Sequence, residues 1–288
     1  CSIIVTYDFN EISLKFIVKK HLLNFKNIII VNNSPKISLQ SIKSPKITVI
    51  NNASNVGLAT ALNIGILESK KKGFNLVALF DQDTLLPDDF AFHMLKNINA
   101  FQDDKRPALF SPVFFDQVTN DYGSLINFKP LRLYRSKPHK NNYIKYPQYV
   151  ITSGSFIPIS VIDDVGLMLN ELFIDFVDIE WCLRARSKGY EIVAYPQLVI
   201  SHNLGDYSIP FFGVNYPIHS PVRMYYYFRN AIYLYQLKGI DMNWKLIDAT
   251  RNIFRFLFYI LFVKQRKTYF RYIIKGYYHG FIKKMGKY

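Results

Sequence analysis

The chain is poor in several features that mark particular protein classes. It has two cysteines, Cys1 and Cys182, in 288 residues. Their spacing matches neither a disulfide framework nor a Cys/His zinc site, which indicates a reducing compartment. The longest apolar run of the tail, residues 253–263, is shorter than the roughly 20 residues that a transmembrane helix needs. With 50% hydrophobic residues, however, the chain has enough apolar side chains for a large core.

Acidic residues are also scarce, and the formal net charge is +15. Such a surplus predicts a polyanionic partner, and nucleic acid, anionic lipid and phosphorylated substrates are the candidates. From Lys245 onward the sequence has many basic residues and a single acidic one, Asp248. A nucleic-acid binder would line a groove with basic and stacking aromatic residues, whereas here the bases gather in the tail. We therefore expect no nucleic-acid partner.

The first half of the chain predicts an α/β sheet. Short β-branched or apolar runs alternate with segments of helical periodicity in the order β-α-β-β-α-β, with strands at 2–6, 28–31, 46–50 and 76–80. Strands that are apolar almost throughout are typical of a parallel sheet covered on both faces. Ligands of such sheets bind at the carboxyl ends of the strands, so we expect the polar residues there to form a site. Residues 116–150 predict loops and a hairpin.

Two carboxylates follow the predicted strand 76–80, in the sequence Asp81-Gln82-Asp83. Hard cations such as Mg²⁺ or Mn²⁺ prefer carboxylate oxygens, and substrate phosphates often complete their coordination. The pair therefore predicts half of a metal site that a nucleotide diphosphate would complete. The alternative is a solvated turn before the next helix, although Asp88 and Asp89 suit that role better.

A second acidic cluster lies in residues 173–185, where Asp178 falls at the start of a helix predicted to end at Gly189. Asp175 precedes it by three residues. Structural alternatives are an N-cap role for Asp178, worth about 1 kcal/mol, and an i,i+4 ion pair between Glu180 and Arg184. His202 follows the strand-like run 198–201, and a lone histidine at such a position is more often structural.

Taken in order, these motifs resemble the inverting family 2 glycosyltransferases with the GT-A fold. The resemblance runs from residue 2 to about Asn230, and the phrases around Asp81 and Asp178 resemble the bacterial rhamnosyltransferase branch. The motifs are Val31-Asn32-Asn33-Ser34, Asn55-Val56-Gly57-Leu58-Ala59, Asp81-Gln82-Asp83, Gly154-Ser155, the 173–184 helix, His202 and the segment 223–230. The implied fold is a Rossmann-like, mainly parallel nucleotide-binding sheet with a C-terminal helical appendage.

The resemblance also implies roles for individual residues. Asp178 would be the catalytic base, and Asp83, Asp81 and His202 would hold Mg²⁺ or Mn²⁺. The nucleotide-sugar contacts would be Thr6, Tyr7, Asp8, Asn32, Asn55, Gly57, Asp81 and Gly154. Contacts to diphosphate or acceptor would come from Arg223, Tyr227, Asn230, Asp175 and Glu180.

The chain departs from the family pattern at two positions. Many members have Asp in the place of Asn32, and an amide offers the nucleobase a donor as well as an acceptor. The common Glu-Asp pair is here Val177-Asp178, which removes a neighbour of the base and leaves the base itself.

The implied organisation is a catalytic domain over 1–220, with a nucleotide-sugar-binding half (1–115) and an acceptor half (116–220). Residues 221–288 would form a basic, aromatic helical region. Its stretch 270–281, with Arg271 and Lys275 among apolar residues, suits a helix in a lipid interface. The alternative is a helical appendage packed on the catalytic domain with a solvated basic face.

The implied activity is transfer of a sugar, L-rhamnose from dTDP-rhamnose or a sugar from a UDP-sugar, to a saccharide or lipid-linked acceptor in capsule or O-antigen synthesis. The enzyme would work in the cytoplasm as a peripheral protein at the anionic inner face of the bacterial plasma membrane. Two rivals are a sugar nucleotidyltransferase, which would carry a Gly-rich basic loop after the first strand, and a non-enzymatic basic binding protein.

Overall fold

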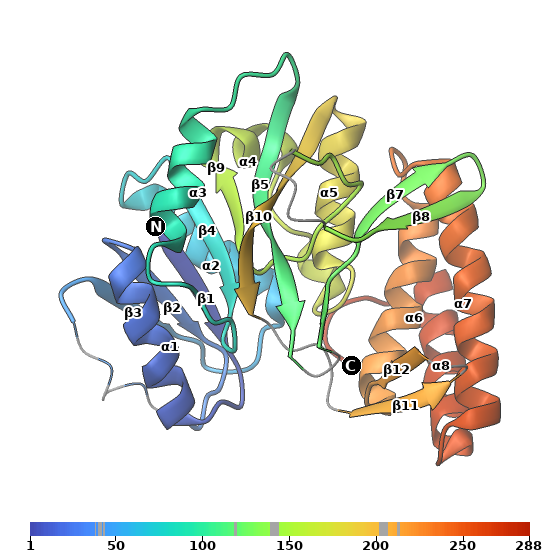
Figure 1. Cartoon of the computed structure of the whole chain (residues 1–288). Helices are drawn as coiled ribbons and strands as arrows, with labels where there is room; N and C mark the ends of the chain where they lie inside the picture. Colours follow the sequence, from blue (N-terminus) through green and yellow to red (C-terminus); the bar gives the residue numbers. More distant parts are fainter. Residues whose placement is uncertain are drawn as a thin grey trace.

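A computed structural model describes residues 1–37, 39, 42, 44–117, 120–138, 144–201, 207–211 and 214–288 (Figure 1). The first half contains β1 (Ser2–Thr6), α1 (Glu11–Asn24), β2 (Ile28–Asn32), β3 (Ile47–Asn51), α2 (Leu58–Lys71), β4 (Leu76–Asp81) and α3 (Phe90–Asn99). The middle contains β5 (Arg106–Asp116), β6 (Asp121–Tyr122), β7 (Leu125–Lys129), β8 (Arg132–Ser136), β9 (Ser155–Pro158), α4 (Ile159–Val165), a 3-10 turn (Asn170–Leu172), α5 (Val177–Ser187) and β10 (Tyr190–Ser201). The last part contains β11 (Tyr207–Phe211), β12 (Val214–Ile218), α6 (Pro221–Gln236), α7 (Met242–Phe262) and α8 (Arg266–Phe281).

The central sheet has the strand order β10-β5-β9-β4-β1-β2-β3, with β6 added beside β5. Strands β3, β2, β1 and β4 are parallel to one another, and β10 is parallel to β5. Strand β9 is antiparallel to both of its neighbours, β4 and β5. The predicted α/β class, the mainly parallel sheet and the C-terminal helices are confirmed. The two smaller sheets are the hairpins β7-β8 and β11-β12.

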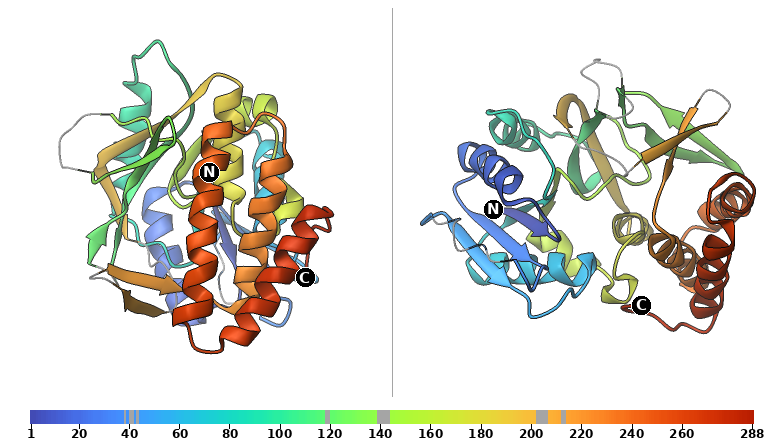
Figure 2. Two further views of the ribbon diagram at one scale, coloured as in Figure 1. Left: turned by 90° about the vertical axis from the view of Figure 1, so that its right-hand side faces the viewer. Right: turned by 90° about the horizontal axis from the view of Figure 1, so that it is seen from below.

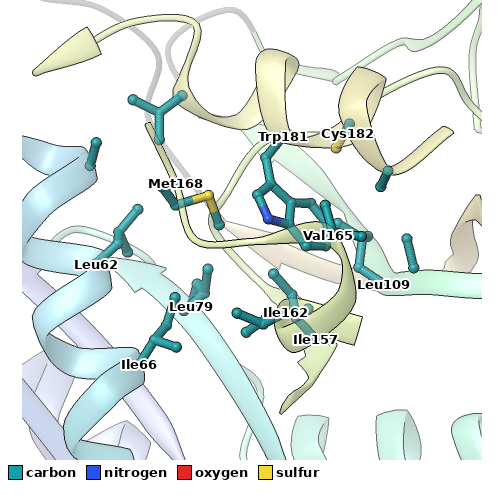
Figure 3. Close-up of a cluster of buried hydrophobic side chains, with 14 of the residues drawn as sticks. Leu62, Ile66, Leu79, Leu109, Ile157, Ile162, Val165, Met168, Trp181 and Cys182 are labelled. Carbon is teal, nitrogen blue, oxygen red and sulfur yellow. The ribbon is translucent and has the colours of Figure 1, made fainter. Parts of the chain in front are cut away.

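The sheet is covered on both faces, which explains its apolar strands. On one face Ile4, Phe80 and Phe156 pack against helices α1 and α3. On the other face Ile3, Leu79 and Ile157 pack against α2, α4 and α5, where Trp181 fills the centre of the cluster (Figure 3). Because successive strand residues point to opposite faces, adjacent residues such as Ile3 and Ile4 belong to different cores.

The sequence analysis predicted no strand at 106–116, yet β5 is one of the longest strands and lies between β9 and β10. Its prolines, Pro107 and Pro112, cannot donate to a ladder and normally demote a run to an edge or a loop. The register between β5 and β10 is irregular beside both prolines, with shifts after Glu191 and after Tyr195. The sheet therefore accommodates the missing donors by local irregularity.

The C-terminal helices form a layer beside the sheet domain, at the right of Figure 1. Helix α8 packs closely on α6 through two glycines. A Cβ at Gly276 would lie 2.6 Å from the Tyr225 carbonyl oxygen, and one at Gly280 would lie 2.5 Å from that of Arg229. Side chains of α6, α7 and α8, among them Phe228, Phe258 and Ile273, form a core of their own. Among the helices that the structure describes, none combines the length and apolar character needed to cross a membrane.

The close approach of α6 and α8 can be tested with Gly280→Ala. An alanine in a helix is normally favoured over glycine by roughly 1 kcal/mol. Here the added methyl group meets backbone, so we expect a net loss of stability of about 1–3 kcal/mol, as for overpacked cores. Urea unfolding measures the change, with the exposed α8 substitution Lys267→Ala as the control. A Gly280→Ala protein as stable as the wild type would contradict the packing.

Candidate active site

Polar residues gather at the carboxyl ends of the parallel strands β1, β2 and β4. Thr6 at the end of β1 pairs in register with Asn32 at the end of β2, and Val5 pairs with Asp81 at the end of β4. The arrows of β1 and β4 point to the same lower edge in Figure 1. The structure thus brings together three of the predicted site residues, Thr6, Asn32 and Asp81.

Asn32 is buried, and its amide is fully engaged by the protein. Its Nδ2 donates to the Ile37 carbonyl at 2.8 Å and to Asn51 Oδ1 at 3.0 Å, while its Oδ1 accepts from the Ser34 backbone at 2.9 Å. An aspartate could not make the two donations. The asparagine therefore fixes the turn after β2, and in this conformation both amide protons point to protein oxygens.

The loops after β1 and β4 are tied to each other. Gln82 Oε1 accepts from the Tyr7 backbone N–H at 2.7 Å, and Gln82 Nε2 donates to the Tyr7 carbonyl at 2.9 Å. The next residue, Asp8, is exposed and left-handed (φ 47°), and its N–H donates to Ser34 Oγ at 2.6 Å. These bonds place Tyr7 and Asp8 beside residues 81–83, which we call the acidic turn.

The start of α2 requires glycine at position 57. Asn55 Oδ1 accepts from the Gly57 N–H at 2.9 Å, and Gly57 has a positive φ of 86°. A Cβ at Gly57 would lie 2.6 Å from the Phe173 ring. The Phe173 carbonyl accepts the Leu58 N–H at 2.6 Å, so it caps α2. The segment after residue 172 therefore contacts helix α2 directly.

The acidic turn is anchored from beneath by a serine. Ser153 Oγ accepts from the Asp81 N–H at 3.2 Å and bonds the Thr84 hydroxyl at 2.5 Å. Gly154 follows with φ 84°, and its N–H donates to the Leu79 carbonyl at 2.8 Å. Asp81 is partly buried and Asp83 is exposed. The two carboxylates thus stand on a fixed turn, one facing inward and one facing solvent.

The segment that leads into α5 is strained. Phe173, Asp175 and Phe176 all adopt left-handed conformations, with φ of 65°, 62° and 63°. Such conformations cost about 1–3 kcal/mol for each non-glycine residue and persist only when surrounding contacts impose them. Phe176 is the residue before α5, so Asp178 falls in the first turn of that helix, as predicted.

Asn230 and Arg229 of α6 supply those contacts. Asn230 is fully buried, and its Nδ2 lies 2.9, 2.7 and 2.9 Å from the carbonyl oxygens of Leu172, Ile174 and Asp175. Its Oδ1 accepts from Arg229, whose guanidinium also donates to the Glu171 and Leu172 carbonyls. In this structure the amide group of Asn230 is taken up by the segment 171–175, which we call the acidic loop, and its ligand role stays a prediction.

Two further predicted residues meet at this loop. Arg223 Nε donates to Asp175 Oδ1 at 3.1 Å. The other oxygen, Asp175 Oδ2, is buried without a hydrogen-bond partner among the described residues. Tyr227 lies one turn further along α6, with its ring 4.7 Å from that of Phe176 and 4.0 Å from the Arg255 guanidinium. A polar pair and an aromatic ring thus flank the entrance to α5.

Asp178 has the electrostatics of a proton acceptor that works near neutral pH. Burial raises its pKa to about 6, and the negative charges of Asp81 and Asp175 add to this rise, while the Ile179 N–H opposes it. The negative charge of Asp81 at the end of β4 thus acts on Asp178 at the start of α5. Carboxylates with such a shift are typical of functional sites.

Other predicted residues stand apart or outside the description. Glu180 is buried, and its oxygens accept from Arg184 at 2.7 and 2.9 Å, as in the ion pair given as the structural alternative, while its ligand role stays a prediction. His202 lies outside the described residues. Within the described part of the chain, no three His, Cys, Asp or Glu side chains gather as a complete metal site. Asp81 and Asp83 nevertheless offer hard oxygen donors suited to Mg²⁺ or Mn²⁺, with positions left for phosphate oxygens.

Several residues of the site were missed by the sequence analysis. Gln82 and Ser153 act through backbone groups, and Arg229 acts across more than fifty residues of sequence, so their types and spacing gave no signal. Tyr149 was missed in the loop region; burial raises its pKa, and the charge of Asp178 contributes to the rise.

Comparisons with known proteins identify the family. Residues 5–162 match the model of "Glycosyl transferase family 2". The dTDP-rhamnosyl transferase RfbF of Shigella flexneri is 31% identical over 278 residues, which cover 95% of this chain and 91% of that protein.

The solved structures of two further proteins share the fold. GalNAc-T7 with UDP, GalNAc and Mn²⁺ has a TM-score of 0.62 at 13% identity, over 98% of this chain and 55% of that one, so this chain spans about half of it. S. aureus TarS 1-349 with UDP-GlcNAc has a TM-score of 0.58 at 13% identity, over 96% of this chain and 80% of that one. These likenesses confirm the predicted GT-A fold.

The bonds of Asn230 predict a large loss of stability in Asn230→Ala. Leaving a buried carbonyl without its donor costs about 1–3 kcal/mol, and the Ile174 and Asp175 carbonyls would lose this donor while that of Leu172 keeps Arg229, so we expect a loss of about 3 kcal/mol. Asn230→Asp keeps the acceptor for Arg229 but loses the donors, and it should also destabilise. Urea unfolding measures both, with Val222→Ala on the same helix as the control. An Asn230→Ala protein as stable as that control would show that the loop holds itself.

The raised pKa of Asp178 predicts a pH-dependent gain of stability in Asp178→Asn. The folded protein binds this proton more tightly than the unfolded chain, so the ionised carboxylate destabilises the fold above pH 6. The penalty fades as the pH falls through 6 and then below the ordinary aspartate pKa of 3.8, so both states are protonated only near pH 3. Melting temperatures should therefore favour Asp178→Asn at pH 8 and converge with the wild type at about pH 3. An equal difference at both pH values would exclude titration of this group as the cause.

Proposed function

The chain belongs to glycosyl transferase family 2, an inverting family, and we propose that it is a metal-dependent rhamnosyltransferase. Its donor would be dTDP-L-rhamnose, and its acceptor a saccharide or lipid-linked saccharide in capsule or O-antigen synthesis. The observation that carries the proposal is the buried Asp178 at the start of α5, whose raised pKa includes a contribution from Asp81 at the carboxyl end of β4. The relation to a dTDP-rhamnosyl transferase along 95% of the chain supports the choice of sugar.

In the proposed reaction Asp178 takes the proton of the acceptor hydroxyl. The freed oxygen forms a bond to the anomeric carbon, while the bond from that carbon to the diphosphate oxygen breaks on the opposite face of the sugar. The electron pair leaves with the nucleoside diphosphate, and the proton stays on Asp178. A base with a pKa of about 6 is ionised at neutral pH and still basic enough to accept the proton.

The leaving diphosphate would be held at the acidic turn. We propose that Asp83, with Asp81, holds Mg²⁺ or Mn²⁺, which neutralises charge that develops on the diphosphate. His202 is proposed as a further ligand. Arg223, beside Asp175, is placed on the acceptor side of the same site and would donate to phosphate or sugar oxygens.

The donor side is assigned to the first half of the chain. We propose that Thr6, Tyr7, Asp8, Asn55, Gly57 and Gly154 border the nucleotide sugar. With both protons of Asn32 held by Ile37 and Asn51, this residue would shape the nucleobase pocket through the turn that it fixes. Residues 1–115 would then bind the donor, residues 116–220 the acceptor, and residues 221–288 would form the helical region.

The proposed acceptor also bears on where the enzyme works. A lipid-linked saccharide would place it at the inner face of the bacterial plasma membrane, as a peripheral protein in the cytoplasm. No nucleic acid is part of the proposal.

A UDP-sugar donor is the second candidate. A structure of the same fold, TarS, holds UDP-GlcNAc, and GalNAc-T7 holds UDP. Donor hydrolysis and ligand-induced melting shifts across a panel of dTDP- and UDP-sugars, each with Mg²⁺, Mn²⁺ or EDTA, separate the two. Activity with UDP-sugars alone would replace rhamnose in the proposal, and no response to any nucleotide sugar would overturn it.

Substitutions of Asp83 and Asp178 should affect donor binding and sugar transfer differently. Asp83→Ala should abolish the metal-dependent part of donor binding and keep the fold. Asp178→Asn should bind donor normally but lose transfer by about 10²–10⁴-fold, the usual contribution of a general base. Isothermal titration measures binding, and product formation measures transfer. The exposed Asp104→Asn provides the control for a lost carboxylate.

Either result can fail separately. Metal-dependent donor binding that survives in Asp83→Ala would remove this residue from the metal site. Transfer at the wild-type rate in Asp178→Asn would move the base to another carboxylate, with Asp175 the next candidate.

A further inference from the structure

Helix α7 presents an apolar face to the outside. Its exposed residues are all uncharged, and only Thr250 among them is polar. They recur at intervals of three, four and one along the helix and comprise Met242, Leu246, Thr250, Ile253, Phe254, Leu257, Leu261 and Phe262. Phe254 is 68% exposed and Leu261 is 62% exposed. The solvent face of a helix in a globular protein is normally charged, so this face lacks a partner.

This exposure is not caused by poor packing of α7. The opposite side of the helix is buried, with Trp244 and Phe258 in two hydrophobic cores. The only acid of the helix, Asp248, is buried and accepts from Tyr235 at 2.7 Å. Helix α7 therefore satisfies one apolar face within the protein and leaves a second one open.

Helix α8 extends the same surface and adds positive charge. Phe270, Ile274, Tyr278 and Phe281 are exposed at i, i+4, i+8 and i+11, which places them on one side of the helix. Exposed cations border them, namely Lys264, Arg266, Lys267, Arg271 and Lys275. The rings of Phe256 and Phe270, 6.2 Å apart, join the two helices. Figure 2 (left) shows α7 and α8 in front of α6, on the side away from the sheet.

We propose that the exposed apolar residues of α7 and α8, with the cations beside them, dock on an anionic lipid surface. Apolar side chains would enter the boundary between headgroups and acyl chains, and the cations would contact lipid phosphates. The described residues from 242 to 288 expose no acidic side chain, and the exposed Asp241 lies at the N-terminal end of α7, whereas the cations lie after its C-terminal end and along α8. A second copy of the chain fits less well, because it would bring two sets of like charges together.

This surface differs from the one expected from the sequence. The prediction placed lipid contact in the stretch 270–281, and the alternative was a packed appendage with a solvated basic face. In the structure the appendage is packed, and α7 provides the longer apolar stripe. The docking surface lies outside the catalytic groups, so lipid binding and sugar transfer can succeed or fail independently.

Vesicle sedimentation tests the proposal on the full chain. The wild type should pellet at 0.1 M NaCl, on the order of tenfold more with vesicles of phosphatidylcholine and phosphatidylglycerol than with phosphatidylcholine alone. Salt at 0.5 M should weaken binding because it screens the charges. The triple variant Phe254→Ser, Leu257→Ser, Leu261→Ser and the triple variant Lys264→Gln, Lys267→Gln, Arg271→Gln should each bind at least tenfold more weakly.

The control removes equally exposed apolar residues elsewhere, with Ile12→Ser, Leu23→Ser and Phe92→Ser on α1 and α3. This control should pellet like the wild type, and all variants should keep the wild-type melting temperature and turnover on a soluble acceptor. A wild type that stays in the supernatant with anionic vesicles overturns the proposal, as does pelleting that the α7 variant leaves unchanged. Light scattering that finds a wild-type dimer and a monomeric α7 variant would also overturn it, in favour of self-association.

Discussion

The contact between the Arg229–Asn230 pair and the acidic loop is the interaction on which the site depends. One asparagine amide holds three successive parts of the loop, and the arginine holds the beginning of the loop and the Gly286 carbonyl. The held segment carries Asp175, leads into the helix of Asp178, and caps α2 through the Phe173 carbonyl. Helix α2, the acidic loop and the C-terminal helix α6 therefore meet through a few backbone carbonyls.

This arrangement costs free energy of folding, and that cost indicates a functional reason for it. Three non-glycine residues in left-handed conformations cost several kcal/mol together. Burial of the Arg229 guanidinium lowers its pKa, which expresses the cost of removing this charge from water. A simple turn would avoid both costs. The strained turn leads the chain into the helix that carries Asp178, while the carbonyl oxygens of Leu172, Ile174 and Asp175 accept from the buried amide and guanidinium groups of α6.

The sequence predicted the parts of the site that follow from strand ends. Polar residues after β1, β2 and β4 had to meet at one edge, because the carboxyl ends of parallel strands coincide. The sequence did not predict β5, because Pro107 and Pro112 suppress the strand signal. It also did not predict the contacts of Asn230 with backbone carbonyls, since a polar residue on an amphipathic helix can face a ligand or a backbone carbonyl, and spacing does not distinguish them. The left-handed residues of the acidic loop carry no glycine signal, so the strain was invisible before the structure.

We propose that Asp178 is the catalytic base and that burial and the charge of Asp81 raise its pKa. The pH dependence of kcat/KM for sugar transfer measures that pKa in the free enzyme. We predict that kcat/KM falls below about pH 6, tenfold for each pH unit, as expected for the protonation of one group. In Asp81→Asn this fall should begin at a lower pH, because a neighbouring negative charge is removed. A kcat/KM that stays constant down to pH 5, or a fall that Asp81→Asn does not move, would contradict the account.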